Sequence, residues 1–340
     1  MKPKNEDRAQ GALLGLAVGD ALGTTLEFKN LSAPAFPTMC DGPHREVVGG
    51  GPFQVKAGQV TDDTQMATAL ANSLRLLKRF DPEDVLARYR EWLPHAFDVG
   101  VQTRSVLEAY DPRLGPFHAA KSYWDHNGRK PAANGSLMRT APIGVYFAED
   151  REARIKASLE DSRLTHADPR CALSCVAFNG AIAAAVAGHD DVRPEMLVTA
   201  ALSDLSIAGA QLGRMMPDAM REVQDATRVV REDLELARAA DPRLYGPEIH
   251  LHHHAGFVRV AFRLAFWELF HAPSFEAALV DVVNRGNDAD TNGAIAGALL
   301  GAAYGEAAIP PSWRNTVLGA SPAGRVWRDV YHPTQLLLLA

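Results

Sequence analysis

The sequence predicts an all-α protein folded as a single domain over residues 1–340. Apolar residues recur at helical spacing along most of the chain, and strand-like patterning is confined to one short segment. No Ser-, Pro- or Gly-rich linker or break in composition divides the 340 residues. With 47% hydrophobic and 22% charged residues, the composition is ordinary for a globular protein.

The first predicted helix, "GALLGLAVGDALG" (residues 11–23), is similar to the last, "GALLGAAYGEAA" (residues 297–308). Both place small residues at a spacing of four, which lets the backbones of packed helices approach closely. The two runs are too short to cross a membrane and carry Asp20 and Glu306, so we expect close packing within the helical core. The similarity occurs only twice and far apart, which is not the pattern of a solenoid repeat.

Between these two helices, the segment "EVVGGGPFQV" is a candidate for a short β-hairpin.

Two helices begin with an Asp-Pro pair, "DPEDVLARYREWL" at Asp81 and "DPRCALSCVAFNGAIAAAVAG" at Asp168, because Asp is a good N-cap and Pro suits the first helical position. The second of these should end near Gly188. Further along, "PDAMREVQDATRVVREDLELARAAD" predicts an amphipathic surface helix, whereas "GFVRVAFRLAFWELFHA" is more apolar and predicts a central helix.

Charge and hydropathy argue against several classes of protein. The balance of 35 basic and 41 acidic residues gives a net charge of −6, without the basic footprint of a nucleic-acid-binding domain. The N-terminal "MKPKNEDRAQ" makes a poor signal peptide because it is partly acidic and Asp20 interrupts the apolar stretch that follows. The longest uncharged stretch of small apolar residues, 293–305, is shorter than the ~20 residues of a membrane span. We therefore expect a soluble, cytoplasmic protein that does not bind membranes. We also expect it to be a monomer.

Three cysteines, Cys40, Cys171 and Cys175, are too few and too scattered for a disulfide framework, which favours a reducing compartment. Cys171 and Cys175 would lie on one face of a helix. Two thiolates can ligate zinc, but no second Cys/His pair lies at the spacing of a zinc finger. We expect these thiols to be buried and inert.

Two clusters of side-chain oxygens precede apolar helices, "TDDT" at Thr61–Asp62–Asp63–Thr64 and "DADT" containing Asp288, Asp290 and Thr291. One Asp or Thr at such a position is explained by N-capping alone. Adjacent carboxylates at a buried helix end repel one another, and their pKa values rise unless a cation neutralises them. Because all-oxygen ligand sets favour hard ions, the clusters indicate a site for Mg²⁺, Mn²⁺ or Ca²⁺, with capping as the alternative.

The two clusters lie far apart in the chain, so a metal site requires a fold that brings two helix N-termini together. A helix of small residues suits this requirement, because it lets the metal-bearing backbone approach its neighbour closely. We therefore expect the Gly/Ala-rich helix that follows Asp290 to be the packed platform behind the ligands.

An ordered set of motifs resembles the ADP-ribosylglycohydrolase family, in particular the dinitrogenase-reductase-activating glycohydrolases and the ADP-ribosylarginine hydrolases. The resemblance covers essentially the whole chain through "GALLGLAVGDALGTTLEF", "TDDTQMA", "FDVGVQT", "NGSLMR", "LTHADP" and "GNDADTNGAIAGALLGAAYG". Each motif is weak alone, and their order makes the set specific. The resemblance implies a compact, single-domain, orthogonal multi-helix bundle with a binuclear Mg²⁺ or Mn²⁺ site at helix N-termini. It also implies hydrolysis of the glycosidic bond between ADP-ribose and its acceptor.

The resemblance assigns roles to particular residues. The metal ligands would be Thr61, Asp62, Asp63, Asp288, Asp290 and Thr291. The catalytic residues would be Asp98, Glu27 and Asp290. Contacts with the substrate would come from Gly100, Thr103, Asn134, Gly135, Ser136 and His166, with the pyrophosphate against a helix start at "NGS".

Some of these residues have simpler interpretations. Asp98 could be a solvated helix-capping residue, "NGS" an ordinary turn, and His166 a loop residue before a helix start. The chain also departs from the family at Val101, where many members carry Asn, which puts a ribose contact in doubt. The cluster His250, His252, His253 and His254 lacks accompanying ligands for zinc and is expected to be a solvated or interhelical loop, with adenine or acceptor contacts as the alternative.

The expected function is metal-dependent removal of ADP-ribose from a modified protein, with the arginine side chain as the favoured linkage and ADP-ribose as the product. One alternative is the same fold acting on another ADP-ribosyl bond, such as serine, O-acetyl-ADP-ribose or a nucleic-acid adduct, of which nucleic acid is the less favoured. The other alternative is an ADP-ribose-binding or toxin-immunity protein without catalysis. Intact metal motifs argue against a pure binder.

Overall fold

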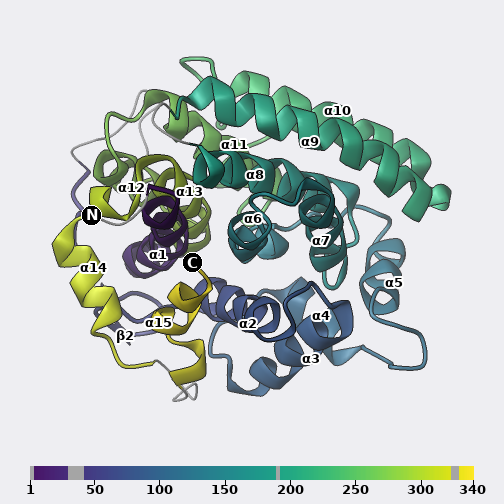
Figure 1. Cartoon of the computed structure of the whole chain (residues 1–340), viewed down its shortest axis with the longest axis horizontal. Coiled ribbons are helices and arrows are strands. Elements are labelled where there is room, and N and C mark those ends of the chain that lie inside the picture. The colour runs from purple at the N-terminus through teal and green to yellow at the C-terminus, as the bar shows by residue number, and fades with distance from the viewer. Residues whose placement is uncertain (1–3, 30–41, 189–191, 323–328) are drawn as a thin grey trace.

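The computed structural model describes residues 4–29, 42–188, 192–322 and 329–340, and these residues form a predominantly helical protein (Figure 1). The predicted hairpin is present as two short antiparallel strands, β1 (Gly49–Gly50) and β2 (Val55–Lys56). The remaining elements are short 3₁₀ helices and the following α-helices: α1 (Lys4–Gly23), α2 (Asp62–Leu77), α3 (Pro82–Trp92), α4 (Val101–Glu108), α5 (His118–His126), α6 (Ala141–Tyr146), α7 (Arg151–Arg163), α8 (Pro169–Ala187), α9 (Pro194–Met215), α10 (Met220–Leu236), α11 (Val258–His271), α12 (Phe275–Asn284), α13 (Ala289–Tyr304), α14 (Pro311–Leu318) and α15 (Pro333–Leu336).

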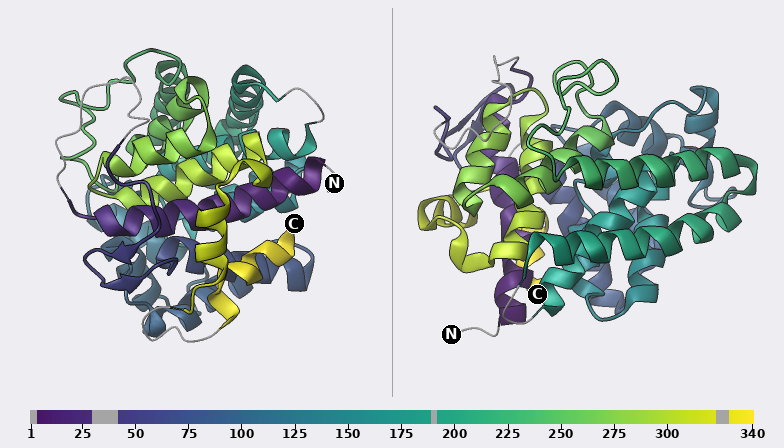
Figure 2. Two further views of the ribbon diagram at one scale, coloured as in Figure 1. Left: turned by 90° about the vertical axis from the view of Figure 1, so that its left-hand side faces the viewer. Right: turned by 90° about the horizontal axis from the view of Figure 1, so that it is seen from above.

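The two glycine-rich helices pack closely within the helical core, as expected, and the structure shows that they pack directly on each other. A Cβ atom added at Gly15 would lie 2.1 Å from the carbonyl oxygen of Gly297, and one added at Gly19 would lie 1.9 Å from that of Gly293. The pairs run in opposite directions along the two helices, so α1 and α13 are antiparallel neighbours (Figures 1 and 2). Only glycine permits this approach, and the C-terminal end of α1 consequently reaches the N-terminal start of α13.

By length and composition alone, helices α8 and α9 could span a membrane. In the sequence, the uncharged stretch at residues 293–305 did not indicate these two helices. The apolar window of α8 is 83% buried within the structure and that of α9 is 44% buried. α8 packs against α6, α7, α9, α10 and α11, which makes it a core helix, and α9 lies beside α10 along one side of the molecule (Figure 1). The same test of length and hydropathy is passed by core helices, so burial explains α8 without a membrane.

Several local predictions are confirmed. The Asp81 carboxylate accepts a hydrogen bond from the backbone N–H of Asp84 at 3.2 Å, and α8 ends at Gly188 as its C-cap. α11 is buried along most of its length, and α10 alternates buried and exposed positions. Cys171 and Cys175 are free and fully buried in α8, and burial raises the pKa of both thiols, which leaves them unreactive. Cys40 lies outside the described residues.

Candidate active site

The first wall of the site forms where the end of α1 meets the start of α13. Glu27 pairs with Asn287 in an isolated parallel β-bridge, and the Phe28 N–H donates to the Asn287 carbonyl at 2.7 Å. This pairing places Glu27 beside the "DADT" cluster. Carboxylate oxygens of Glu27, Asp288 and Asp290 all lie within 4.8 Å of one another. Three carboxylates therefore converge from two segments that are remote in sequence.

The start of α2 is fixed by Asp20, which projects from α1. Its buried carboxylate accepts hydrogen bonds from the backbone N–H groups of Thr61 at 3.0 Å and Thr64 at 3.2 Å, and from the Thr64 hydroxyl at 2.6 Å. The Thr61 hydroxyl lies 3.0 Å from Asp20 Oδ1 and 2.9 Å from Asp63 Oδ2. Asp20 thus caps a helix to which it does not belong. In the sequence, Asp20 is an isolated charge within an apolar helix. This isolation was the signal that could have indicated a hydrogen-bonding partner on another element.

A cleft of about 530 Å³ collects most of the predicted site residues. The predicted residues that line it are Glu27, Asp62, Asp98, Gly100, Thr103, Asn134, Gly135, His166, Asp288, Asp290 and Thr291. The fully buried Thr61 and Asp63 are not among the lining residues. Both clusters of oxygens therefore reach one cleft, as a shared metal site requires.

Electrostatic repulsion dominates this cleft. Its lining includes five carboxylates, and no lysine or arginine stands among the lining residues of the described chain. Burial, reinforced by the charges of Asp288 and Asp20 and opposed by a hydrogen bond with Asp290, raises the pKa of Glu27 to about 7. Burial and the charge of Glu27 raise the pKa of Asp98 to about 8. The remaining carboxyl groups of the cluster follow the same direction, since burial raises the pKa values of Asp62, Asp63, Asp288 and Asp290.

These residues fit a divalent metal ion. Glu27 Oε2 and Asp63 Oδ1 are buried and have no hydrogen-bond partner, which is costly for a carboxylate oxygen. A cation between the carboxylates would satisfy these atoms and offset the repulsion. The donors are all oxygens, which suits Mg²⁺ or Mn²⁺.

The opposite wall contains the "NGS" segment. Asn134 Nδ2 donates to Asp288 Oδ2 at 2.6 Å, and the Asn134 N–H donates to the Gly256 carbonyl at 2.9 Å. A Cβ at Gly135 would lie 3.0 Å from the His166 ring and 3.2 Å from the Thr103 hydroxyl, so a larger residue at position 135 would crowd these two side chains. The expected helix start is absent here, because residues 134–136 form a three-residue 3₁₀ turn and α6 begins only at Ala141.

Ser136 lies apart from the other predicted contact residues. Its fully buried hydroxyl is 2.9 Å from the Ser162 hydroxyl and 3.6 Å from the Cys175 sulfur, and the residue does not line the cleft. Its side chain therefore ties the turn to α7 and α8.

His166 lies in the loop before α8, but its side chain is buried and lines the cleft. Burial and the positive charge of Arg139 lower the pKa of His166 to about 3, which keeps the imidazole neutral near pH 7. Its Nδ1 atom lies 2.8 Å from the Thr165 hydroxyl. A neutral ring with one nitrogen donating and one accepting can bind a polar substrate without adding charge.

Asp98 precedes α4, whose N-cap is Gly100. The alternative in which Asp98 caps this helix is therefore not the arrangement observed, and Asp98 lines the cleft instead. Val101, the residue that departs from the family pattern, also lines the cleft and is 78% exposed.

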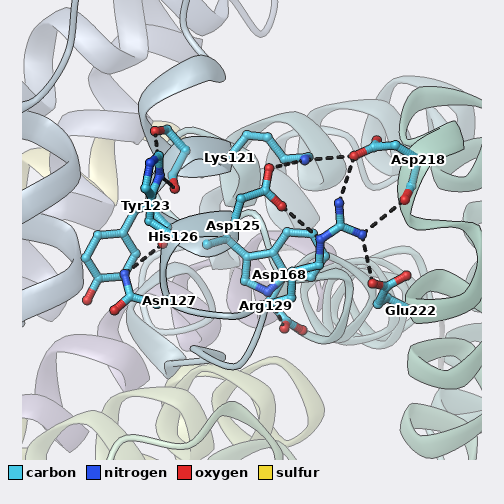
Figure 3. A network of polar contacts seen from close by, with 11 residues as sticks. Lys121, Tyr123, Asp125, His126, Asn127, Arg129, Asp168, Asp218 and Glu222 are labelled. Carbon is cyan, nitrogen blue, oxygen red and sulfur yellow. Dashed lines mark hydrogen bonds and ion pairs between the residues drawn. The ribbon is translucent and has the colours of Figure 1, made fainter.

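Tyr123 is a lining residue that the sequence did not indicate. It projects from α5, which a network of charged residues attaches to the start of α10 (Figure 3). Arg129 bridges to Glu222 at 2.8 Å and to Asp218 at 3.1 Å, and Lys121 reaches Asp218 at 2.8 Å. The neighbouring Trp124 donates from its indole N–H to Asp168 at 2.8 Å. No local sequence pattern predicts that Tyr123 lines the cleft, because its position depends on these contacts between elements.

The histidine cluster forms an interhelical loop, as one interpretation expected. His252 Nε2 lies 2.9 Å from the Arg285 carbonyl, while His253 and His254 are exposed. Asn287 Nδ2 donates to the carbonyl oxygens of Leu251 at 3.0 Å and His252 at 2.8 Å. The loop therefore supports the start of α13, and none of the four histidines lines the cleft, although the residues that follow them, Ala255 and Gly256, do.

A larger cavity of about 810 Å³ borders α10, α11 and the loop between them. Both arginines and carboxylates line its wall, including Arg231, Glu232, Glu235 and Arg243, and it contains none of the predicted site residues. The convergence of the predicted site residues identifies the smaller cleft as the candidate active site, although the other cavity is larger.

Comparisons with known proteins agree with this geometry. A family model described as ADP-ribosylglycohydrolase matches residues 1–336. The chain is 30% identical to the ADP-ribosylarginine hydrolase Tri1 of Pseudomonas putida over 96% of this chain and 78% of the relative. It is also 30% identical to the ADP-ribosyl-[dinitrogen reductase] glycohydrolase of Rhodospirillum rubrum over 92% of this chain and 90% of the relative. A solved structure, an ADP-ribosylglycohydrolase-related protein complex, superposes with a TM-score of 0.67 at 30% identity and covers 98% of both chains.

Proposed function

The chain belongs to the ADP-ribosylglycohydrolase family, and on that premise we propose that it removes ADP-ribose from arginine side chains of modified proteins in a metal-dependent reaction. It is an ADP-ribosyl glycohydrolase. The observation that carries the finer assignment is the concentration of five carboxylates, with no lining lysine or arginine in the described chain, in one cleft. Such a cleft attracts cations, and two kinds of cation are relevant.

The first kind is the metal. Two Mg²⁺ or Mn²⁺ ions would be held by Thr61, Asp62, Asp63, Asp288, Asp290 and Thr291, with Glu27 at their border. When bound, such ions orient sugar hydroxyls and make a bound water more acidic.

The second kind of cation is the guanidinium group of the acceptor. Asp98 borders the cleft in a loop rather than within the buried ligand cluster, and its carboxylate can accept two parallel N–H bonds from a planar guanidinium. A carboxyl group whose pKa is raised toward neutrality can also hold or release a proton at its Oδ atoms as the C–N bond breaks. A serine acceptor offers no positive charge to this carboxylate, so the site favours arginine.

The chain's own polar groups on the opposite wall would orient ADP-ribose. The Asn134 amide holds Asp288 in place, and the neutral His166 and the Thr103 hydroxyl flank Gly135. These groups can bind ribose or phosphate oxygens by hydrogen bonds. ADP-ribose should therefore inhibit competitively, and ribose alone should inhibit hardly at all.

The decisive experiment measures release of ADP-ribose from an ADP-ribosyl-arginine protein and an ADP-ribosyl-serine peptide by mass spectrometry. The arginine substrate should be cleaved faster, EDTA should abolish turnover, and excess Mg²⁺ or Mn²⁺ should restore it. Asp98→Asn should lose about 100-fold or more in turnover of the arginine substrate while it still binds ADP-ribose in calorimetry. Asp111→Asn, at a partly exposed loop position outside the cleft, is the matched control and should behave as wild type.

Each alternative has its own outcome in this experiment. Faster cleavage of the serine linkage, or near-normal turnover by Asp98→Asn, would overturn the arginine assignment and leave the metal-dependent hydrolase in place. Tight ADP-ribose binding without turnover of any ADP-ribosyl bond would instead identify a binding or immunity protein.

A further inference from the structure

Three phenylalanines form a continuous apolar surface beside the acidic cleft. The rings of Phe28 and Phe53 lie 6.2 Å apart and those of Phe53 and Phe97 lie 5.5 Å apart, both in edge-to-face geometry. Phe28 is 66% exposed, whereas Phe53 and Phe97 are half-buried. We call Phe28, Phe53 and Phe97 the aromatic rim. It is assembled from three separate segments, so no single stretch of sequence revealed it.

The backbone under the rim is held in an unfavourable conformation. Phe28 has φ = 58°, in the left-handed region that bulky side chains rarely adopt. Its N–H group donates to the Asn287 carbonyl at 2.7 Å, and the Lys29 N–H donates to the Leu26 carbonyl at 3.1 Å. These bonds hold the backbone in the conformation that leaves the Phe28 side chain exposed.

The hairpin that carries Phe53 is also fixed in place. The Thr25 hydroxyl donates to the Gly49 carbonyl at 2.9 Å, and a Cβ at Gly51 would lie 2.3 Å from the Thr24 carbonyl oxygen. The hairpin therefore packs tightly against the residues that lead to Glu27. A rim anchored in this way is already ordered before a partner arrives, which lowers the entropic cost of binding.

The rim is continuous with the candidate catalytic residues. Phe28 directly follows Glu27, Phe97 directly precedes Asp98, and Phe28 itself lines the cleft. Val101, 78% exposed, adds an apolar side chain to the same cleft. If Asp98 receives the acceptor side chain, the main chain of that acceptor must continue past these rings.

We propose that the aromatic rim is the docking surface for the polypeptide around the modified arginine, and that it selects acceptors with apolar side chains next to that arginine. This inference rests on the proposed function. Charge complementarity would draw the guanidinium to Asp98, and the rim would bury a neighbouring apolar side chain that a free ADP-ribosyl-arginine lacks. The partner is therefore a protein or peptide rather than a small ADP-ribosylated metabolite.

The test compares three substrates with the metal-loaded wild-type enzyme. They are a peptide with ADP-ribosyl-arginine flanked by leucines, the same peptide with serines in place of the leucines, and ADP-ribosyl-arginine itself. Burial of one apolar side chain predicts a KM about 10-fold lower for the leucine peptide than for the other two, with similar kcat. This comparison requires no variant, so it stands even if changes in the rim affect folding.

Variants of Phe53 then assign the preference to the rim, because Phe53 does not line the cleft. Phe53→Ser should raise KM for the leucine peptide about 10-fold and leave ADP-ribosyl-arginine turnover unchanged. Phe53→Leu should restore most of the preference. Ile207→Ser, which removes an exposed apolar side chain from α9, is the matched control and should change neither value.

The outcomes separate the two proposals. Equal kcat/KM for the leucine and serine peptides, or equal losses on all three substrates in Phe53→Ser, would overturn the docking role while leaving the hydrolase assignment intact. Failure to cleave any of the three substrates in the presence of Mg²⁺ or Mn²⁺ would instead refute the proposed function.

Discussion

Aspartates at helix starts serve two different purposes in this protein, as a comparison of α3 with α13 shows. Asp81 at the start of α3 accepts the backbone N–H of Asp84, and hydrogen bonds, first that from Arg79, lower its pKa. Asp288 occupies the corresponding position of α13, makes no capping bond with its side chain, and has a pKa raised by burial. The partners of the carboxylate, rather than its position in the helix, distinguish a cap from a candidate ligand.

The start of α2 is an intermediate case. Its N-cap Thr61 also makes no capping bond of its own, because Asp20 from α1 receives the free N–H groups. Asp62 and Asp63 are thereby released from capping and remain available to a cation. Because the Asp20 carboxylate of α1 accepts the free N–H groups at the start of α2, the carboxylates there can face a cation instead of capping their own helix.

The largest effect should follow from breaking the ligand role at α13. Asp288→Asn preserves the shape of the side chain and removes its charge, so kcat/KM should fall by at least about 100-fold, since even residues that only orient metal ligands cost 10–100-fold. Asp81→Asn is the matched control and should retain activity. Steady-state kinetics at saturating Mn²⁺ measures both, and normal turnover by Asp288→Asn would contradict the ligand assignment.

The raised pKa values predict how the metal-free protein responds to pH. In the folded state the pKa is about 6 for Asp20, 7 for Glu27 and 8 for Asp98, above the ordinary values of 3.8 for Asp and 4.5 for Glu, so the folded state binds more protons between about pH 4 and pH 8. The stability of metal-free protein should therefore fall as pH rises through this window and level off above it. Thermal unfolding in EDTA measures the slope, and added Mn²⁺ should reduce it. A stability that rises from pH 5 to pH 8 in EDTA would show that the carboxylates are not mutually destabilising.

Removing the Asp20 carboxylate, which caps α2 from α1, should have an intermediate effect. Asp20→Ala leaves the N–H groups of Thr61 and Thr64 without their acceptor in a buried place, which should lower the free energy of unfolding by about 1–3 kcal/mol. Because α2 then loses its anchor, Mn²⁺ affinity should also fall by about 10–100-fold. Denaturant titration and Mn²⁺ electron paramagnetic resonance measure the two effects. A loss of stability with unchanged Mn²⁺ affinity would assign Asp20 a purely structural role.

The smallest effect should come from the ordinary cap. Asp81→Ala should lower the free energy of unfolding of the metal-free protein by about 1 kcal/mol, as loss of an N-cap does, and leave Mn²⁺ affinity unchanged. The same two measurements test it. A change in Mn²⁺ affinity here would mean that helix starts outside the cleft also influence the metal site. It would contradict the distinction between a capping aspartate in α3 and a metal-binding aspartate in α13.

The sequence by itself determined the helical class, the Asp-Pro helix starts, the close packing expected of the two glycine-rich helices and the two clusters of oxygens, whereas the structure showed that these two helices pack on each other. These features depend on residues close together in the chain, because periodicity, capping and small-residue spacing are local properties. The ordered motifs also indicated the family, which the comparisons show.

Only the tertiary structure decided which side chains share the cleft. Glu27 meets Asp288 through a β-bridge between remote segments, Asp20 caps a helix that is not its own, and the Ser136 hydroxyl lies against Ser162. The expected helix start at Asn134 proved to be a 3₁₀ turn, since a short polar motif does not specify whether a helix continues. Tyr123 and the aromatic rim were likewise beyond the sequence, because contacts between distant segments depend on the packing of the whole chain rather than on any local pattern.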